Sequence, residues 1–569
     1  MRDQLMAWQA RLAPVDWVPW MIIGFAALLR FFLLGIKPPH FDEGINGWFV
    51  DQMIRSGFYK YDPTNYHGPL HFYVLFLSQT LFGRNVWALR LPVVLVSALC
   101  VWLTFKFEPF VGRTAARLTA LAMAVSPGFV FYGRYSIHEV WLQLFSMMFV
   151  LGLLGLWKFG TARYLWCVGM GIAGMILTKE TYIIHIGCAI IAAGVCYVTN
   201  WLSPMPDIRP AKQTWSIVDL VLVCAVGIAL IVFFYSGTFF YWNGVKDIFK
   251  AYAAWFQTGH EGHGHEKPFY YWVKLLAPSF QFPRADFLGY ELPALAGLIL
   301  CVFCLRFKNI SFRYLAIYGV GTLMAYSIVH YKTPWCIISI IWPFLFLFGA
   351  AASFVPLRLK LAEYAVIGGL LLIPAGAAVF CAIMWDIGYA WSLSLIVGVI
   401  VLLIALRNRQ AMIGLAVIVL CLSLVSTIWL NYFRCTTESE PYVYVQTYND
   451  IFKLTKPVLE LARQDPVFYM MVGHIIRESA YPLPWILDDF PNIGYYEHDN
   501  LPAKIDADFL LVQEAKVGGI EAKLHDSYYT DWMTIRSYQD PSKLYLNAKM
   551  FKGFFPDRAP DFVGHGQQP

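Results

Sequence analysis

Long apolar runs recur along most of this chain, and they restrict its fold more than any other feature. A helical run of about 20 apolar residues matches the hydrocarbon thickness of a bilayer, where a backbone must satisfy its own hydrogen bonds. With 58% hydrophobic and only 14% charged residues, the chain is far more apolar than a soluble protein. We therefore predict an α-helical polytopic membrane protein with about 13 transmembrane helices, near residues 17–36, 87–105, 115–131, 139–157, 164–177, 182–199, 217–236, 288–305, 314–330, 335–354, 362–384, 389–406 and 411–431.

Basic residues cluster in alternate connections between these runs, and this alternation predicts the orientation. Connections such as those with Lys106 and Arg113, or with Arg407 and Arg409, face the cytoplasm by the positive-inside rule. The net charge of +6 reflects this asymmetry, and we expect no nucleic-acid partner. We predict a multi-pass protein of the cytoplasmic (inner) membrane, embedded in the lipid bilayer. Its periplasmic or extracellular side then holds the loops 37–86 and 237–287 and the polar tail.

Two domains are predicted from the change in composition near residue 435. Residues 1–435 form the transmembrane domain, and within its first outer loop Pro69 starts a short interfacial helix over 70–83. Residues 436–569 are long enough for one small extracytoplasmic α/β domain. We expect a helix near 451–463 and strands within 442–448, 467–473 and 507–514.

An acidic pair, Asp42 and Glu43, lies in the segment 40–44, which begins about four residues past the first apolar run. Because carboxylates cost several kcal/mol to bury in hydrocarbon, the pair belongs either to a solvated loop or to a site that faces a membrane-borne substrate. In a site, the pair could act as a general base on an acceptor hydroxyl or bind a divalent cation. Glu139, which begins the fourth run on the same side, is the natural second acid.

Single cations occupy three short outer turns, against the charge bias of that side. They are Arg134, Lys179 and Lys332. Converging cations are what a lipid phosphate needs, since each donates charge-assisted hydrogen bonds to its oxygens. The alternative is interfacial snorkelling with local ion pairs. Further candidate site residues near the acids and cations are His40, His67, Tyr135 and Trp335.

A histidine- and glycine-rich segment precedes an aromatic cluster in the second long outer loop. Its histidines and glutamates could bind a metal, although the interleaved glycines leave such ligands without a rigid frame. Alternatively, the loop orders over a bound substrate and its aromatics stack on a sugar, or these aromatics form an interfacial belt. The candidate substrate-loop residues are His263, His265, Glu266, Lys267, Tyr270, Tyr271 and Trp272. No cofactor is predicted beyond a divalent metal (Mg²⁺, Mn²⁺ or Zn²⁺) with candidate ligands Asp42, His263 and His265.

Four short motifs occur in an order that resembles the GT-C superfamily of membrane glycosyltransferases, which includes protein O-mannosyltransferases, oligosaccharyltransferases and lipid A aminoarabinose transferases. They are FDEG (41–44), GPLxxY (68–73), ALRLP (88–92) and LTKE (177–180). More narrowly, three segments look like an archaeal and bacterial branch named for an association with lipid-glycan flippase activity. They are HEKPFYYW (265–272), YKTPW (331–335) and YPLPWIL (481–487).

This resemblance implies a hexosyl or pentosyl transferase that takes a sugar from a polyprenyl-phosphate donor. The sugar would pass with inversion, at the outer face of the membrane, to a hydroxyl of a protein, lipid or glycan. By this resemblance, Asp42 matches the catalytic acid of the superfamily, and Glu139 lies at the position where its members have a second acid. Members that use a monophosphate donor work without a metal, whereas oligosaccharyltransferases need one.

Two other functions stay open at this point. A flippase for a lipid-linked glycan is the main alternative, although transporters tend to have inverted repeats and charged or broken helices near the bilayer midplane. Here the charges lie at the ends of the apolar runs instead. The third reading is a scaffold without catalytic activity, whose external domain binds partners.

Overall fold

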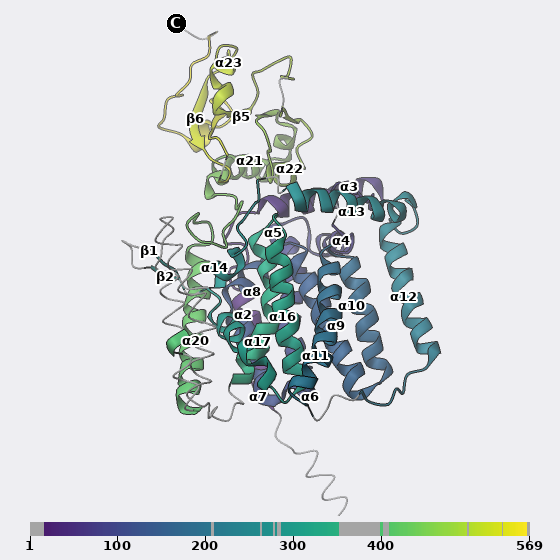
Figure 1. Ribbon diagram of the computed structural model, residues 1–569. Helices are drawn as coiled ribbons and strands as arrows, with labels where there is room; N and C mark the ends of the chain where they lie inside the picture. The colour runs from purple at the N-terminus through teal and green to yellow at the C-terminus, as the bar shows by residue number, and fades with distance from the viewer. Residues whose placement is uncertain are drawn as a thin grey trace, which may run out of the picture.

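The computed structural model describes most of the chain, and its helices form a bundle with a small sheet domain at one end (Figure 1). The structure describes residues 16–65, 67–205, 210–261, 264–276, 279–281, 286–288, 290–351, 399–401, 409–497, 500–537 and 539–565.

The bundle consists of apolar helices of different lengths, as the sequence broadly predicts. They are α2 (Trp17–Phe31), α5 (Val86–Phe105), α7 (Arg113–Val125), α8 (Pro127–Tyr132), α9 (Glu139–Phe159), α10 (Ala162–Ile176), α11 (Tyr182–Leu202), α12 (Ile217–Tyr235), α15 (Leu292–Leu300), α16 (Ile310–Ile328), α17 (Ile337–Ala351) and α20 (Arg409–Ile428). In the described part of the chain, six helical segments are long and apolar enough to cross a membrane. The chain is therefore a multi-pass membrane protein. The count of 13 spans is not confirmed, because 362–384 and most of 389–406 lie outside the described residues.

Two predicted spans are each broken into two pieces. Within 115–131, α7 ends before Ser126, whose side chain accepts a hydrogen bond from the Phe129 N–H and so caps α8. Pro127 begins α8, and a proline is tolerated in the first turn of a helix but not in its interior. Within 288–305, α15 continues as a 3₁₀ helix over Cys301–Arg306.

Two helices, α3 (Phe41–Ser56) and α13 (Asn243–Glu261), lie across the end of the bundle that is nearest the sheet domain (Figure 1). Helix α4 (Leu70–Phe82) confirms the helix predicted after Pro69. Helix α3 was not predicted, because Gly44 and Gly47 interrupt its pattern and a glycine weakens a helix by roughly 1 kcal/mol relative to alanine. Shorter elements are α6 (Glu108–Val111), at the opposite end, α14 (Tyr271–Leu276), and the antiparallel pair β1 (Ser279–Gln281) and β2 (Asp286–Leu288).

The C-terminal residues form a mixed five-stranded sheet in the order β4-β3-β5-β7-β6. Strand β3 (Gly473–Ile476) is parallel to β4 (Ile493–Tyr495) and β5 (Phe509–Gln513), whereas β7 (Ser542–Asn547) is antiparallel to β5 and β6 (Tyr528–Met533). Helix α21 (Phe452–Gln464) buries Leu454 and Val458 in a core shared with Phe509. The short helices α22 (Leu483–Ile486) and α23 (Val517–Glu521) complete the domain, so the α/β prediction is confirmed.

The strand predictions in this domain are only partly right. Residues 507–514 contain β5, but most of 467–473 is a 3₁₀ helix (Pro466–Met470). The prediction for 442–448 is wrong, since this segment forms only one isolated bridge, between Thr447 and Arg536. A π-helical turn, Trp429–Phe433, follows α20 directly. We call residues 436–448 the connecting segment, because they link this turn to the sheet domain.

Candidate functional site

A cavity of about 280 Å³ lies where α3, α9, α13 and the turn after α10 meet, and it brings together residues that are far apart in the sequence. Of the predicted site residues, six line it: Asp42, His67, Glu139, Lys179, Trp272 and Trp335. Other lining residues that the sequence did not single out for the site include His138, Trp255, Tyr326 and Tyr331. The cavity thus combines two acids and a cation with aromatic walls.

Asp42 stands in the first turn of α3, with its side chain 30% exposed. Burial raises the pKa of Asp42 to about 6, and the nearby charge of Glu139 acts in the same direction. His67, Arg536 and Lys179 oppose this rise. A carboxylate with this pKa is ionised at neutral pH and is still basic enough to accept a proton, as a general base must.

His40 caps α3 and orients its first turn. Its Nδ1 accepts a hydrogen bond of 3.0 Å from the Asp42 N–H, so Nε2 carries the proton and donates to the Tyr444 carbonyl oxygen at 2.9 Å. Burial lowers the pKa of His40 to about 3, which is consistent with a neutral ring. Tyr135 packs behind it, with ring centroids 4.4 Å apart. Neither His40 nor Tyr135 is among the residues that line the cavity, so both support α3 from outside the cavity.

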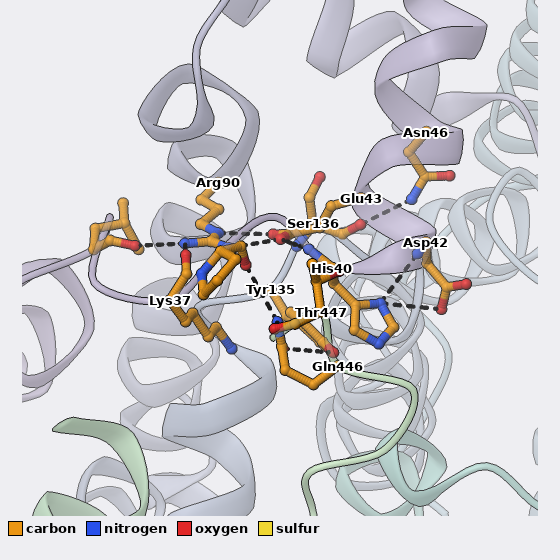
Figure 2. Close-up of polar contacts among 12 residues, drawn as sticks. Lys37, His40, Asp42, Glu43, Asn46, Arg90, Tyr135, Ser136, Gln446 and Thr447 are labelled. Atoms are coloured by element: carbon orange, nitrogen blue, oxygen red, sulfur yellow. Dashed lines mark hydrogen bonds and ion pairs between the residues drawn. The ribbon is translucent and has the colours of Figure 1, made fainter. Parts of the chain in front are cut away.

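Glu43 does not share the position of Asp42, although the two residues are adjacent. Its fully buried carboxylate accepts hydrogen bonds from Arg90 at 2.7 and 2.8 Å, from the His40 N–H and from the Ser136 N–H (Figure 2). Burial would raise its pKa, but Arg90 and the other donors outweigh burial and lower it to about 2. Glu43 was predicted as a catalytic acid, but it lies outside the cavity lining and anchors α3 to α5.

Glu139 and Lys179 form a buried ion pair in the cavity wall. The Cys336 sulfur lies 3.9 Å from the Lys179 Nζ and 4.0 Å from the Glu139 Oε1. Burial tends to lower the pKa of Lys179, but Cys336 and Glu139 together raise it well above its usual value. Lys179 therefore keeps its positive charge in the cavity.

The other two predicted phosphate-binding cations have partners elsewhere. Arg134 donates to the carbonyl oxygens of Leu29, Phe32 and Leu33 at 2.7 to 3.1 Å, and so satisfies the C-terminal end of α2. The Lys332 Nζ donates to the carbonyl oxygens of Lys267, at 3.0 Å, and of Val329. Neither residue is among those that line the cavity. Both cations therefore stabilise backbone carbonyls, and Lys179 alone of the three predicted cations lines the cavity.

The predicted substrate loop is tied to the connection between α16 and α17. His265 bonds through Nδ1 to the Tyr444 hydroxyl, and Glu266 pairs with Tyr331 in an isolated antiparallel bridge. The Lys267 N–H donates to the His330 carbonyl oxygen at 3.3 Å. Of the described residues predicted in this loop, only Trp272 lines the cavity, whereas Tyr271 is half-buried and Tyr270 is exposed.

The metal prediction remains a prediction. The described ranges contain no group of three or more His, Cys, Asp or Glu residues that could hold a metal ion. His263, one of the three candidate ligands, lies outside the described residues.

Sequence reasoning missed several residues in and around the cavity. Arg90 had a signal, since an arginine inside an apolar run needs a buried partner. His138 lines the cavity beside Glu139, and within the described part of the chain its buried Nε2 has no hydrogen-bond partner. Tyr444 contacts both His40 and His265, and no local pattern in the connecting segment predicts this.

Comparisons with known proteins agree with this architecture. Residues 66–234 match the family model of dolichyl-phosphate-mannose-protein mannosyltransferases. No curated protein matches the sequence.

Among solved structures, the fold is similar to that of ArnT from Cupriavidus metallidurans. The crystal structure of ArnT bound to undecaprenyl phosphate has a TM-score of 0.57 and 16% identity, covering 95% of this chain and 99% of that chain. The apo structure of ArnT has a TM-score of 0.53 and 15% identity, covering 96% and 99%. The narrower resemblance to the flippase-associated branch stays a prediction. The family model and the fold together confirm that this chain resembles the GT-C membrane glycosyltransferases, which use polyprenyl-phosphate donors.

Proposed function

We propose that the protein transfers a sugar, hexosyl or pentosyl, from a polyprenyl-phosphate donor to an acceptor hydroxyl, with inversion at the anomeric carbon. The observation that carries this proposal is the meeting of Asp42 with the Glu139–Lys179 pair in one cavity, in a fold similar to ArnT. ArnT itself has been crystallised with undecaprenyl phosphate, a lipid carrier of this class. The family match over residues 66–234 supports the same donor class.

In the proposed reaction, Asp42 is the general base. The acceptor hydroxyl gives its proton to the Asp42 carboxylate as its oxygen attacks the anomeric carbon from the face opposite the phosphate. The bond between the anomeric carbon and the phosphate oxygen breaks, and its electron pair leaves with the phosphate. General-base assistance of this kind contributes roughly 10² to 10⁴ in rate.

Lys179 is the residue we assign to the departing phosphate. Negative charge accumulates on the phosphate oxygens as the bond breaks, and a fixed cation in a partly dry cavity stabilises that charge strongly. Glu139 holds the Lys179 ammonium through their ion pair, so that the cation is positioned before the substrate arrives. Trp335, a partly buried residue of the cavity lining, offers a flat surface for the sugar.

The lipid part of the donor has an apolar approach along α13. Thr258 and Gly259 of this helix line the cavity, while Phe249 and Phe256 on the same helix are largely exposed. Exposed aromatic side chains at the end of a membrane bundle suit the headgroup level of a bilayer. We place the cavity and the sheet domain on the periplasmic or extracellular side of the inner membrane, because the basic connections favour the cytoplasm.

A transfer assay with the purified protein and a radiolabelled polyprenyl-phosphate sugar tests this function. We expect the label to move to an acceptor hydroxyl, and NMR of the product to show the anomeric configuration opposite to that of the donor. Retention of configuration would contradict a single displacement. Movement of the intact lipid-linked sugar across a vesicle membrane, without transfer, would indicate the flippase alternative, which neither the family match nor the fold favours.

A further inference from the structure

The helix that carries Asp42 is covered on one face by the C-terminal domain. Helices α3 and α22 lie side by side (Figure 1), and Gly44 and Gly47, about one turn apart on α3, face the segment around α22. A Cβ built on Gly44 would lie 2.6 Å from the Cβ of Pro482, and one built on Gly47 would overlap the indole ring of Trp485. In both cases the added Cβ would come much closer to its neighbour than van der Waals contact allows. These two glycines therefore let the C-terminal domain approach the backbone of α3 closely.

Arg84, which lies between α4 and α5, stabilises the same contact. Arg84 donates to both carboxylate oxygens of Asp51, on α3, at 3.1 Å each, and to the carbonyl oxygen of Trp485. Its guanidinium also lies 5.4 Å from the Trp485 ring centroid. Because Asp51 and Trp485 are both buried, Arg84 joins α3 and the C-terminal domain in a shielded cluster.

The first turn of α3 has its own contact with the domain. The Arg536 guanidinium lies 3.7 Å from the ring centroid of Phe41, the residue directly before Asp42. Arg536 is held in place by a hydrogen bond of 2.7 Å to the Ser479 hydroxyl. On a neighbouring face of α3, Glu43 bonds to Arg90 and the Asn46 side chain donates to the Ser136 carbonyl oxygen at 2.8 Å (Figure 2). The transmembrane bundle and the C-terminal domain thus hold two adjacent faces of α3.

We propose that Gly47 and Trp485 are positioning residues for transfer, and that the C-terminal domain acts as a clamp that holds α3 with Asp42 in the cavity. This inference rests on the function proposed above. It assigns the domain a part in catalysis that does not depend on its binding an acceptor. A displacement of about 1 Å at a reacting group can cost roughly 10²-fold in rate, so a clamp at this helix has direct consequences for turnover.

A double-mutant cycle tests the clamp. Gly47→Ala forces α3 and Trp485 apart, Trp485→Leu removes the indole, and the double variant restores room for the added methyl group. We expect Gly47→Ala to lower kcat by roughly 10-fold or more, with the KM for the donor changed less than about 3-fold. The double variant should recover most of the loss relative to Gly47→Ala, because residues in contact give non-additive effects.

Two control variants and a second readout make the result decisive. Gly24→Ala adds a Cβ to a helical glycine of α2 that has nothing within 4 Å, and Trp532→Leu alters an exposed tryptophan of the same C-terminal domain. Hydrogen exchange of the α3 amides reports the clamp without any enzymatic assay. Exchange should rise in Gly47→Ala and in Trp485→Leu, should fall back toward the native rate in the double variant, and should be native in both controls.

Unchanged exchange at α3 in both single variants would overturn the clamp, whatever the enzyme does. Faster exchange with native kcat would overturn the positioning role. If Gly47→Ala does not fold, Trp485→Leu by itself decides the matter through the same two measurements. If the wild-type protein transfers no sugar, the proposed function is contradicted. The hydrogen exchange of the α3 amides would still show whether the C-terminal domain holds this helix.

Discussion

The Glu43 carboxylate accepts two hydrogen bonds from the Arg90 guanidinium, and both side chains are fully buried between α3 and α5. This pair joins two motifs that are 47 residues apart, and it fixes the start of the helix that carries Asp42. The adjacent acids therefore have separate tasks: Glu43 anchors α3 and Asp42 faces the cavity.

Glu43→Gln should destabilise the protein by about 3 to 5 kcal/mol, because it leaves the Arg90 charge buried without its partner. Thermal unfolding in detergent measures this loss. Arg558→Gln breaks a partly exposed pair with Asp561 and serves as the control, with an expected effect below about 1 kcal/mol. Equal stability of Glu43→Gln and wild type would refute the anchoring role.

The pH dependence of transfer should follow the ionisation of Asp42. Burial raises its pKa to about 6, so the carboxylate is deprotonated and able to accept a proton above that pH. Turnover should therefore fall as the pH drops through about 6, and it should level off above 7. Initial rates measured from about pH 3 to about pH 8 check this. An acidic limb centred near pH 4 would mean that Asp42 titrates like an exposed aspartate.

Lys179 and Lys332 should behave differently, although the sequence predicts one role for both. Lys179→Met removes the cation of the cavity and should lower kcat by roughly 10²- to 10³-fold. Lys332→Met removes donors to the Lys267 and Val329 carbonyl oxygens, so it should lower the melting temperature and leave the KM for the donor near its native value. Steady-state kinetics of the two variants, side by side, decide between these roles.

Tyr444→Phe isolates the contact between the connecting segment and the substrate loop. The variant loses the hydroxyl that bonds to His265, but the Tyr444 carbonyl oxygen still accepts from His40. Since one hydrogen bond contributes about 0.5 to 1.5 kcal/mol, the KM for the donor should rise roughly 2- to 10-fold while kcat changes little. A native KM would show that the His265 contact does not affect donor binding.

The bundle and the cavity acids were predictable because their signals are local. Apolar runs have the length of a membrane span, and Asp42, Glu139 and Lys179 lie at or near the ends of such runs. Helix α3 was not predictable, because Gly44 and Gly47 weaken the helical pattern. Only the folded structure shows that these glycines make room for Pro482 and Trp485.

The roles of the other charged residues depend on distant partners. Arg134 stands in a short turn between helices like Lys179, but its guanidinium is satisfied by carbonyl oxygens at the end of α2, about 100 residues earlier in the chain. Glu43 could not be separated from Asp42 without its contact with Arg90. Charge at a turn indicates that a residue has a polar partner, and only the fold shows whether that partner is a substrate or the protein backbone.

Transfer by the Asp42→Asn variant tests most directly whether Asp42 takes the proton from the acceptor. The variant keeps the size of the side chain and removes its basicity, and Asp531→Asn, an exposed acid of the C-terminal domain, is the matched control. We predict that Asp42→Asn binds the polyprenyl-phosphate sugar and folds normally, but transfers at least about 10²-fold more slowly than wild type, while Asp531→Asn is fully active. Native transfer rates in Asp42→Asn would contradict the mechanism.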